Sequence, residues 1–388
     1  MAKFSKKTKE TSDKKVVRVI RKMINDIMEG KTEGKFEMPW HKLASTGMPV
    51  NSKNVRYKGI NVLSLWLASY CEGFSSNIWF TYGNAQEIRT DEPRRLATEE
   101  EKETYFKLFK GTNFYKFNVY NDNNSTMKTE VAELGVTPIK IGNKRFIPST
   151  KIARGDTLEV ETFAHVKKGE SSKVSVLFTK PRSKTEIDPE TGDEVTTFFK
   201  PIYKHYAVFN ADQIEGLPEG LRSEKKEFPK LTGRLPLADN FIADTGANIR
   251  FGGSRACYIP SVDRIELPVF EDFKTVNGYY STALHELIHW TGAKTRKDRK
   301  LDSIGKFGGK GYAIEELIAE MGSAMAMARL GITATPRTDH AQYMNSWLKA
   351  LNEDDSFILK ASAKAQEGVD YLEEVVNTPK TVTLKEVA

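Results

Sequence analysis

The most constraining segment of the chain is residues 282–292, TALHELIHWTG, which contains the motif His-Glu-x-x-His. A helix has 3.6 residues per turn, so His285 and His289 lie on one face, where both imidazoles can reach a single metal ion. Glu286 then lies beside the ion, where its carboxylate can hold a water molecule and take its proton. The alternative is that the histidines fall four residues apart without binding a metal. Since the chain has only six histidines, such a chance match is expected in on the order of one chain in a hundred, and a metal site is predicted.

A catalytic zinc ion takes three protein ligands and leaves one position open, so a third ligand is needed. One class of zinc proteins supplies a further histidine three residues after a glycine that corresponds to Gly292 here. That position is Thr295, which excludes this arrangement. The other common ligand is a carboxylate from a following helix. Residues 312–324 form an apolar, alanine-rich helical pattern that carries three acids.

Two of these acids, Glu316 and Glu320, share a helix face, where like charges are unfavourable unless a cation or a histidine N–H compensates them. We therefore expect Glu316 to bind the metal and Glu320 to stand behind a ligand histidine. The pair resembles the Glu-x-x-x-Asp of thermolysin-like zincins, in which Glu is the ligand and Asp supports it. In this chain Glu320 replaces that Asp. Glu315 is expected to be a solvated helix residue.

The composition indicates a globular protein that is long enough for two domains. No apolar run approaches the length of a membrane span, and the N-terminus has no signal-peptide core, so we expect no membrane partner and a location in the cytosol. The two cysteines, Cys71 and Cys257, fit no metal-binding pattern and are expected to be buried. The net charge of +7 permits an anionic partner but does not require one.

Basic residues dominate the first 35 positions, with 11 Lys and Arg against five acids. Apolar residues recur there at helical spacing from Val16 to Met28, after a good N-cap at Ser12-Asp13, which predicts an amphipathic helix with a basic outer face. Further on, Trp40 and the run Arg56-Tyr57-Lys58 interleave rings with cations, as single-strand binders do. The alternative is that the rings pack in a core and the cations are solvated.

The middle of the chain shows strand patterns. Residues 157–163 and 173–178 alternate with period two and are joined by a turn containing Lys167 and Lys168, which predicts a hairpin with a basic tip. Residues 188–192 mark a second turn, and residues 206–210 read as another strand. Residues 90–130 are rich in charge and Asn, which indicates an insertion without a core of its own.

The C-terminal part begins after a linker candidate at residues 218–236. Residues 256–259 and 264–267 are predicted to be strands that precede the metal helix. Residues 343–351 and 356–371 are predicted to be helices. The basic segment 294–300, between the two metal helices, is expected to be a solvated turn.

Several segments taken together resemble the ArdC antirestriction family. They are Pro39-Trp40, residues 57–61, 208–214, 245–250 and 285–292, and residues 312–320. Members of this family are carried by conjugative plasmids and phages and shield incoming DNA from host restriction. They join an N-terminal single-stranded-DNA-binding domain to a C-terminal zincin-like metallopeptidase domain. Antirestriction is what the resemblance implies, and nothing in the composition or spacing shows it.

We therefore predict an α+β protein. An N-terminal α+β domain over residues 1–220, with insertions near 90–150 and 181–197, would be followed by a linker at 221–234 and a mostly helical zincin-like domain over 235–388. The first domain would bind single-stranded DNA, and the second would bind Zn²⁺ or another divalent ion such as Mn²⁺. The residues expected to contact DNA are Trp40, Arg56, Tyr57, Lys58, Asn61, Lys167 and Lys168.

Two alternatives remain open at this point. The protein could be a DNA-tethered metalloprotease that cuts restriction enzymes or other DNA-bound proteins in the bacterial host, with Glu286 as general base. It could also be a binding protein whose metal is only structural. The intact Glu286 argues against the second, because a structural site needs no base.

Overall fold

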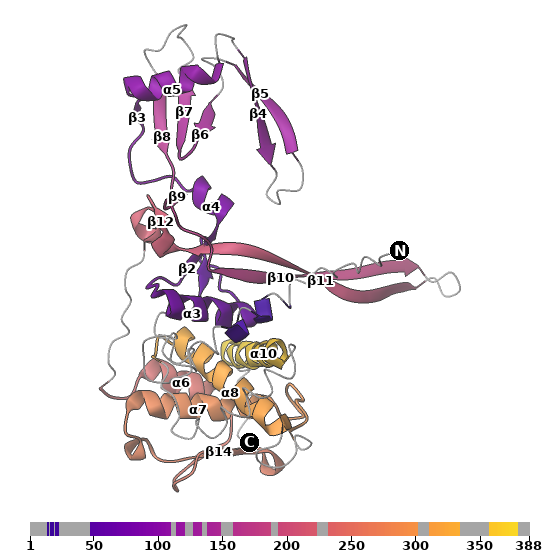
Figure 1. The fold of residues 1–388 in the computed structure, drawn as a ribbon. Coiled ribbons are helices and arrows are strands. Elements are labelled where there is room, and N and C mark those ends of the chain that lie inside the picture. The colour runs from indigo at the N-terminus through magenta and orange to yellow at the C-terminus, as the bar shows by residue number, and fades with distance from the viewer. Residues whose placement is uncertain are drawn as a thin grey trace, which may run out of the picture.

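The computed structural model describes residues 14, 16–18, 20–22, 47–109, 114–120, 127–133, 138–148, 158–187, 193–222, 232–301, 310–333 and 357–378. The fold is α+β, as predicted. Figure 1 shows three tiers: a small sheet with one helix, a central sheet that extends into a long hairpin, and a helical tier that carries the predicted metal helix. Among the described residues, no helix is long and apolar enough to cross a membrane.

The first tier combines part of the segment 90–130, predicted to be an insertion without a core of its own, with later residues up to 162. Residues of that segment do lie in a core, since Ala97 and Tyr105 share one with residues 139–160. The elements of the tier are β3 (Arg95–Leu96), α5 (Glu99–Phe109), β6 (Ile139–Ile141), β7 (Lys144–Pro148) and β8 (Leu158–Thr162). The strands form an antiparallel sheet in the order β3-β8-β7-β6. Beside it, β4 (Phe114–Tyr120) pairs with β5 (Met127–Glu133). Helix α5 buries Tyr105 against Phe146 and Val160, so sparse apolar residues still build a separate core.

The start of α5 is fixed by a capping box. The Thr98 hydroxyl accepts from the Glu101 N–H at 3.3 Å, and a Glu101 carboxylate oxygen accepts from the Thr98 N–H at 2.8 Å. The same carboxylate pairs with Arg95 and Lys144, at 2.7 Å each. These contacts tie the helix start to β3 and β7.

The central tier is a sheet in the order β1-β2-β11-β10, formed by β1 (Val50–Asn51), β2 (Ile78–Thr81), β10 (Val174–Ile187) and β11 (Glu194–Asn210). Helix α3 (Ile60–Glu72) packs against it, and Trp66 of this helix is buried. Smaller elements complete the tier: α4 (Tyr82–Glu87), β9 (His165–Val166), η2 (Ala211–Gln213), β12 (Ile214–Glu215) and η3 (Glu219–Leu221).

The predicted hairpin between residues 157–163 and 173–178 does not form. Both segments are strands, but β8 pairs with β3 and β7, whereas β10 pairs with β11. The reason is burial: Leu158 and Val160 join the core of the first tier, and Val174 and Val176 join a cluster with α3. Between them, β9 pairs with β12. The true hairpin joins β10 to β11 around the second predicted turn, whose residues 188–192 lie outside the described part.

The third tier contains the predicted strands and helices of the C-terminal part. A sheet in the order β13-β15-β14 is formed by β13 (Ile249–Phe251), β14 (Cys257–Ile259) and β15 (Arg264–Leu267). The helices are α6 (Pro236–Asp244), α7 (Val276–Thr291), α8 (Lys310–Arg329) and α10 (Phe357–Asn377), with short turns η4 (Pro260–Val262) and η5 (Phe270–Asp272). Both cysteines are free and half-buried rather than buried. The helix predicted over residues 343–351 lies outside the described residues.

A continuous hydrophobic core joins the central tier to the helical tier. It includes Val62 and Leu63 of α3 together with buried residues of α7, α8 and α10. Val16, Val17 and Ile20 of the N-terminal segment are helical and also lie in this core, as the amphipathic pattern predicts. Of the predicted linker 221–234, residues 223–231 lie outside the described part.

Candidate metal centre

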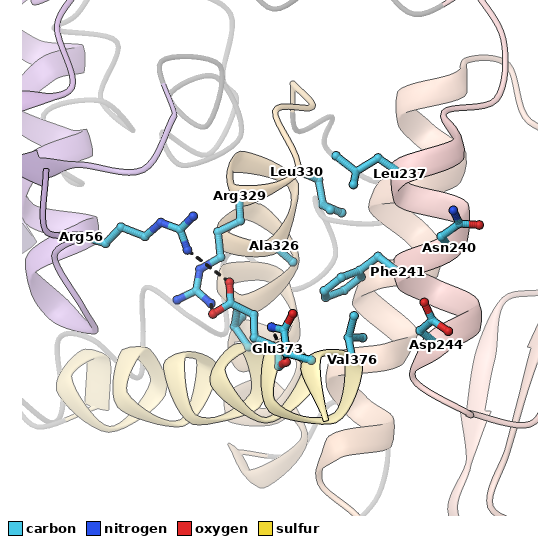
Figure 2. A pocket seen from close by; sticks show the side chains of 12 residues that line it. Arg56, Leu237, Asn240, Phe241, Asp244, Ala326, Arg329, Leu330, Glu373 and Val376 are labelled. Atoms are coloured by element: carbon cyan, nitrogen blue, oxygen red, sulfur yellow. Dashed lines mark hydrogen bonds and ion pairs between the residues drawn. The ribbon is translucent and has the colours of Figure 1, made fainter. Parts of the chain in front are cut away.

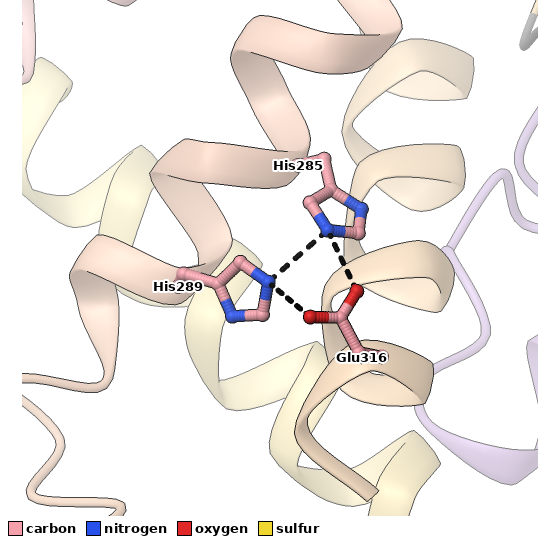
Figure 3. Close-up of side chains that lie close together, drawn as sticks. All are labelled: His285, His289 and Glu316. Atoms are coloured by element: carbon pink, nitrogen blue, oxygen red, sulfur yellow. Dashed lines mark hydrogen bonds and ion pairs between the residues drawn. The ribbon is translucent and has the colours of Figure 1, made fainter. Parts of the chain in front are cut away.

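Helix α7 holds the His-Glu-x-x-His motif in the middle of the helical tier. The Thr275 hydroxyl caps the helix by accepting from the Gly278 N–H at 3.0 Å. Most residues of α7 are buried, and the helix packs against α8 and α10. The helix is therefore fixed in rotation, and both histidines face α8 (Figure 3).

Three side chains converge at one point between α7 and α8. Nε2 of His285 lies 3.1 Å from Nε2 of His289. The carboxylate of Glu316 lies 3.5 Å from the first of these nitrogens and 3.6 Å from the second. Figure 3 shows the three groups pointing toward one another. Ligands bound to one tetrahedral zinc ion at 2.0–2.1 Å are about 3.3 Å apart, so these separations suit a shared divalent ion.

The outer nitrogens of both imidazoles face carboxylates. Oε1 of Glu320 lies 2.9 Å from Nδ1 of His285, in the supporting position expected for it. Oε1 of Glu315 lies 3.1 Å from Nδ1 of His289. A carboxylate at Nδ1 favours the tautomer whose proton is on Nδ1, which leaves the Nε2 lone pair free for a metal. The donor set therefore fits a divalent cation such as Zn²⁺ or Mn²⁺.

The prediction that Glu315 is solvated is wrong. Its side chain is 6% exposed and also accepts from Arg299, whose Nη2 lies 2.6 Å from the carboxylate. The prediction of a solvated turn at residues 294–300 agrees with the exposed residues 294, 295 and 300, but it is wrong for Arg299, whose side chain is only 4% exposed. It donates to the Ile288 carbonyl at 2.6 Å and to the Thr291 hydroxyl at 2.8 Å. Arg299 thereby ties the segment that follows α7 to the acid that holds His289.

Gly292 at the end of α7 is required by this packing. A Cβ atom at Gly292 would lie 2.7 Å from the guanidinium of Arg299, which is too close for any side chain. The sequence contained one sign of this arrangement, since Glu315 lies within the alanine-rich metal helix and Arg299 lies in the segment between the two metal helices. Spacing alone did not reveal that the two residues meet.

The electrostatics of the acids follow from their neighbours. Burial raises the pKa of Glu316, but the His285 hydrogen bond and the two imidazoles outweigh it and lower the pKa to about 2. For Glu315 burial also opposes ionisation, and the contacts with His289 and Arg299 lower its pKa below the ordinary range. Both carboxyl groups are therefore anionic at neutral pH, as a metal site requires.

Glu286 is buried next to the metal residues and is held by the neighbouring strand. Its Oε2 accepts from the Tyr258 N–H of β14 at 2.8 Å. Strand β14 lies at the edge of its sheet. The contact orients the carboxylate, and sequence spacing gave no indication of Tyr258 as its partner.

The residues predicted to contact DNA lie in different settings. Arg56 pairs with Glu373 at 3.3 Å and Lys58 pairs with Asp370 at 3.0 Å, so both cations meet α10 while staying half-exposed or more. Burial raises the pKa of Tyr57 to about 12, and its ring packs against two hydrophobic clusters. Trp40 lies outside the described residues.

Asn61 forms a reciprocal pair with the backbone of Leu177. Its amide donates to the Leu177 carbonyl at 2.8 Å and accepts from the Leu177 N–H at 2.6 Å. The side chain is buried, and it fastens α3 to the outer edge of β10. Just before α3, Gly59 has φ 56°, a region that favours glycine, and its N–H donates to Gln366 of α10 at 3.0 Å.

Lys167 and Lys168 are exposed but do not lie at a hairpin tip. Nζ of Lys167 donates to the Asp212 carbonyl at 2.7 Å, which anchors this segment to η2. Among the described residues, no contact joins these two lysines to Arg56 or Lys58.

A pocket of about 310 Å³ lies where Arg56 meets the helical tier. Figure 2 shows Arg56, Arg329 and Glu373 at one end, and Leu237 and Phe241 of α6 along the other. None of the candidate metal residues lines this pocket. Arg329 is buried and pairs with both Glu373 and Asp370, so the acids that meet the N-terminal cations also neutralise a core arginine.

Comparison with known families finds one match in each part of the chain. Residues 14–137 match the family described as the N-terminal domain of anti-restriction factor ArdC. Residues 236–364 match the family described as a zincin-like metallopeptidase. The second match contains every candidate metal residue.

Some of the similar proteins align with nearly the whole chain. The crystal structure of the antirestriction protein ArdC from plasmid R388 in metal-free form has a TM-score of 0.59 and 30% identity, over 93% of this chain and 97% of that chain. The Mn(II)-bound structure of the same protein gives a TM-score of 0.58. The uncharacterized protein y4eC of Sinorhizobium fredii (strain NBRC 101917 / NGR234) is 30% identical over 361 residues, which are 92% of this chain and 90% of that protein. DNA primase TraC of Escherichia coli is 38% identical over 221 residues, 54% of this chain but only 20% of TraC.

Proposed function

Because the chain belongs to the ArdC family of antirestriction proteins, we propose that it binds single-stranded DNA and protects incoming phage or plasmid DNA from host restriction. The observation that carries the proposal is the similarity to ArdC of plasmid R388, which spans both parts of the chain rather than the zincin-like part alone. The protein would act in the bacterial cytosol, where restriction takes place.

Exposed cations of the central tier support DNA binding. Arg56, Lys58, Lys167 and Lys168 keep enough exposure to reach phosphates. DNA would have to compete with Glu373 and Asp370 for the first two. We assign Asn61 and Tyr57 to the scaffold instead, since both are committed to packing or hydrogen bonds.

Fluorescence anisotropy with the full chain and labelled oligonucleotides tests this function. Single strands should bind more tightly than duplex, and log affinity should fall with log salt by about 0.7 per phosphate contact. The double substitutions Arg56→Ala with Lys58→Ala, and Lys167→Ala with Lys168→Ala, should each weaken binding. Lys364→Ala on α10, an exposed lysine paired with Glu367, is the matched control. If the chain does not bind single strands, or if its affinity for them does not depend on salt, the proposal is contradicted.

The metal centre would be held by His285, His289 and Glu316. A divalent ion bound there supplies Lewis acidity that polarises a carbonyl oxygen. Glu320 and Glu315 orient the two imidazoles, and Arg299 keeps Glu315 anionic and in place. Glu286, fixed by the Tyr258 N–H, is placed to take a proton from a water molecule in the site.

The second candidate function is a metalloprotease that is brought to DNA by its N-terminal part. The observation that favours it is the ordered Glu286: a structural metal site needs no such base, yet here a buried carboxylate stands beside the ligands. Its substrates would be restriction enzymes or other DNA-bound host proteins.

A restriction challenge with wild type and Glu286→Gln separates the two functions. If the protein protects DNA by coating it, the substitution leaves both binding and protection intact, and this is the result we expect. If it cleaves an endonuclease, the variant binds DNA but loses protection, since a positioned base contributes on the order of 10²–10⁴-fold. A gel of the endonuclease after the challenge provides the decisive readout. Fragments with wild type only would establish the protease.

A further inference from the structure

The hairpin of β10 and β11 extends far beyond the sheet from which it starts (Figure 1). Strand β2 pairs with β11 only over residues 208–210. Beyond that point the two strands pair with each other, out to Ile187 and Glu194. We call residues 178–187 and 194–206 the arm. The arm overlaps the segment 181–197, which the sequence marks as an insertion, at residues 181–187 and 194–197.

The arm has one face that combines cations with rings. Successive residues of a strand point to opposite faces, and directly paired residues share a face. The register therefore places Phe178, Lys180, Arg182 and Lys184 of β10 on one face with Lys204, Ile202 and Phe199 of β11. Two contacts agree with this arrangement: the Arg182 guanidinium lies 5.8 Å from the centre of the Phe199 ring, and the Phe178 and Tyr206 rings meet edge to face at 5.2 Å. We call this set the basic face.

The basic face is open to solvent, although rings normally become buried. Phe178 is 50% exposed and Phe199 is 47% exposed. Lys180, Arg182, Lys184 and Lys204 are exposed as well. The opposite face carries Phe198 and Tyr203 beside Thr179, Ser183 and Thr185. Both faces thus carry exposed rings, but the basic face combines its rings with Lys180, Arg182, Lys184 and Lys204.

Pairing of another strand to the edge of the arm is disfavoured. Pro181 and Pro201 have no N–H to offer to a neighbouring strand, and the register shifts between Lys180 and Arg182. Prolines, bulges and lysines are the features that protect exposed edges from strand addition. The surface available for binding is therefore the face of the arm and not its edge.

The charges of the arm indicate which kind of ligand binds it and where. Four basic side chains on one face attract an anion, and a phosphate at Lys184 would compete with Glu186, its ion-pair partner on the same face. Residues 186–194 near the turn include five acids, which would repel an anion there. Rings between the cations suit a ligand that alternates charge with flat apolar surface. Single-stranded nucleic acid has this chemistry, with phosphates for the cations and bases that stack on rings. In duplex DNA the bases are stacked on one another and are not free to do so.

We propose that the basic face of the arm binds single-stranded DNA, with Lys180, Arg182, Lys184 and Lys204 on phosphates and Phe178 and Phe199 stacked on bases. This inference rests on the proposed function and assigns its main contact surface to a part of the chain outside the segments that carry the family resemblance.

Anisotropy with the full chain tests the inference. Replacing Lys180, Arg182 and Lys184 by Ala should make the log–log salt slope shallower by about 2, because each phosphate contact contributes about 0.7. Phe178→Ala or Phe199→Ala should weaken single-strand binding on the order of 10- to 100-fold if the ring stacks on a base. The matched control is Phe198→Ala, which removes an exposed ring from the opposite face. Unchanged melting temperatures would exclude misfolding.

The outcomes separate the inference from the proposed function. If wild type does not bind single strands, the proposed function fails. If wild type binds and the basic-face variants bind equally well, the arm inference is overturned while the function stands. An equal loss with Phe198→Ala, or an equal loss for duplex, also overturns it. Variants that keep DNA affinity but lose protection in the restriction challenge would identify the arm as a protein-binding surface instead.

Discussion

The carboxylate of Glu315 lies 3.1 Å from Nδ1 of His289, and Arg299 holds the same carboxylate from the other side. Glu315 thus adjoins the ligand Glu316 on α8 but supports His289, the ligand on α7. Because this contact favours one tautomer of His289, the basicity of one ligand depends on Arg299, which lies outside the motif in the segment that follows α7.

The first prediction concerns the ligands. His285→Ala or Glu316→Ala should abolish stoichiometric binding of Zn²⁺ or Mn²⁺, because two imidazoles and one carboxylate supply all the donors. Glu320→Ala should only weaken binding. Isothermal titration with metal measures this. A site emptied by Glu320→Ala but still filled in Glu316→Ala would reverse our assignment.

The second prediction concerns the supporting acid. Glu315→Gln should reduce metal affinity by about 10- to 100-fold, the usual effect of losing a partner of a ligand histidine. The substitution also leaves the buried Arg299 without its counter-ion, so stability must be measured in parallel. Pairing Glu315→Gln with Arg299→Met removes both charges. If the double variant recovers stability but not metal affinity, Glu315 acts on the metal; full recovery of affinity argues against that role.

The third prediction concerns metal removal. A ligand that binds only the folded state at 100 times its Kd stabilises that state by about 2.7 kcal/mol. Adding Zn²⁺ or Mn²⁺ to chelator-treated wild type should therefore raise its Tm by several degrees. Glu316→Ala should show no such shift. Differential scanning calorimetry checks this, and an equal shift in both proteins would mean that the metal binds elsewhere.

The fourth prediction concerns Asn61. Asn61→Ala leaves the Leu177 N–H and carbonyl without their buried partner, which should cost on the order of 1–3 kcal/mol of the free energy of unfolding. Asn84→Ala, an exposed asparagine on α4, should be nearly neutral. Urea unfolding compares the two. An Asn61→Ala variant that remains stable but loses DNA affinity would instead show that Asn61 contacts DNA.

The fifth prediction concerns pH. The hydrogen bond from Arg95, joined by Lys144 and opposed by burial, holds the pKa of Glu101 well below its usual range. A carboxyl group whose pKa is lowered by folding contributes stability above its unfolded value, near 4.5, and loses it as the pH falls further. The difference in Tm between wild type and Glu101→Gln should therefore be largest near pH 7 and shrink below pH 4.5. A difference that stays constant with pH would contradict this.

Local spacing in the sequence was enough to predict much of the molecule. The positions of His285, His289 and Glu316 depend on helical periodicity within α7 and α8, and the structure brings these residues together. The strands predicted at residues 256–259 and 264–267 also followed from the pattern of the sequence. Such features depend on residues a few positions apart, so the chain encodes them locally.

Only the tertiary structure decided which elements meet. Nothing in the alternation of β8 and β10 distinguishes a shared hairpin from two separate sheets, because alternation specifies a buried face and not a partner. Glu315 faces His289, and not solvent, because of how α8 is rotated against α7 and because Arg299 folds back over Gly292. Arg56 and Lys58 meet α10 for a similar reason, since the core shared by α3 and the helical tier brings residues more than 300 positions apart into contact. The sequence by itself determined the donors of the metal site, whereas long-range packing determined what orients them.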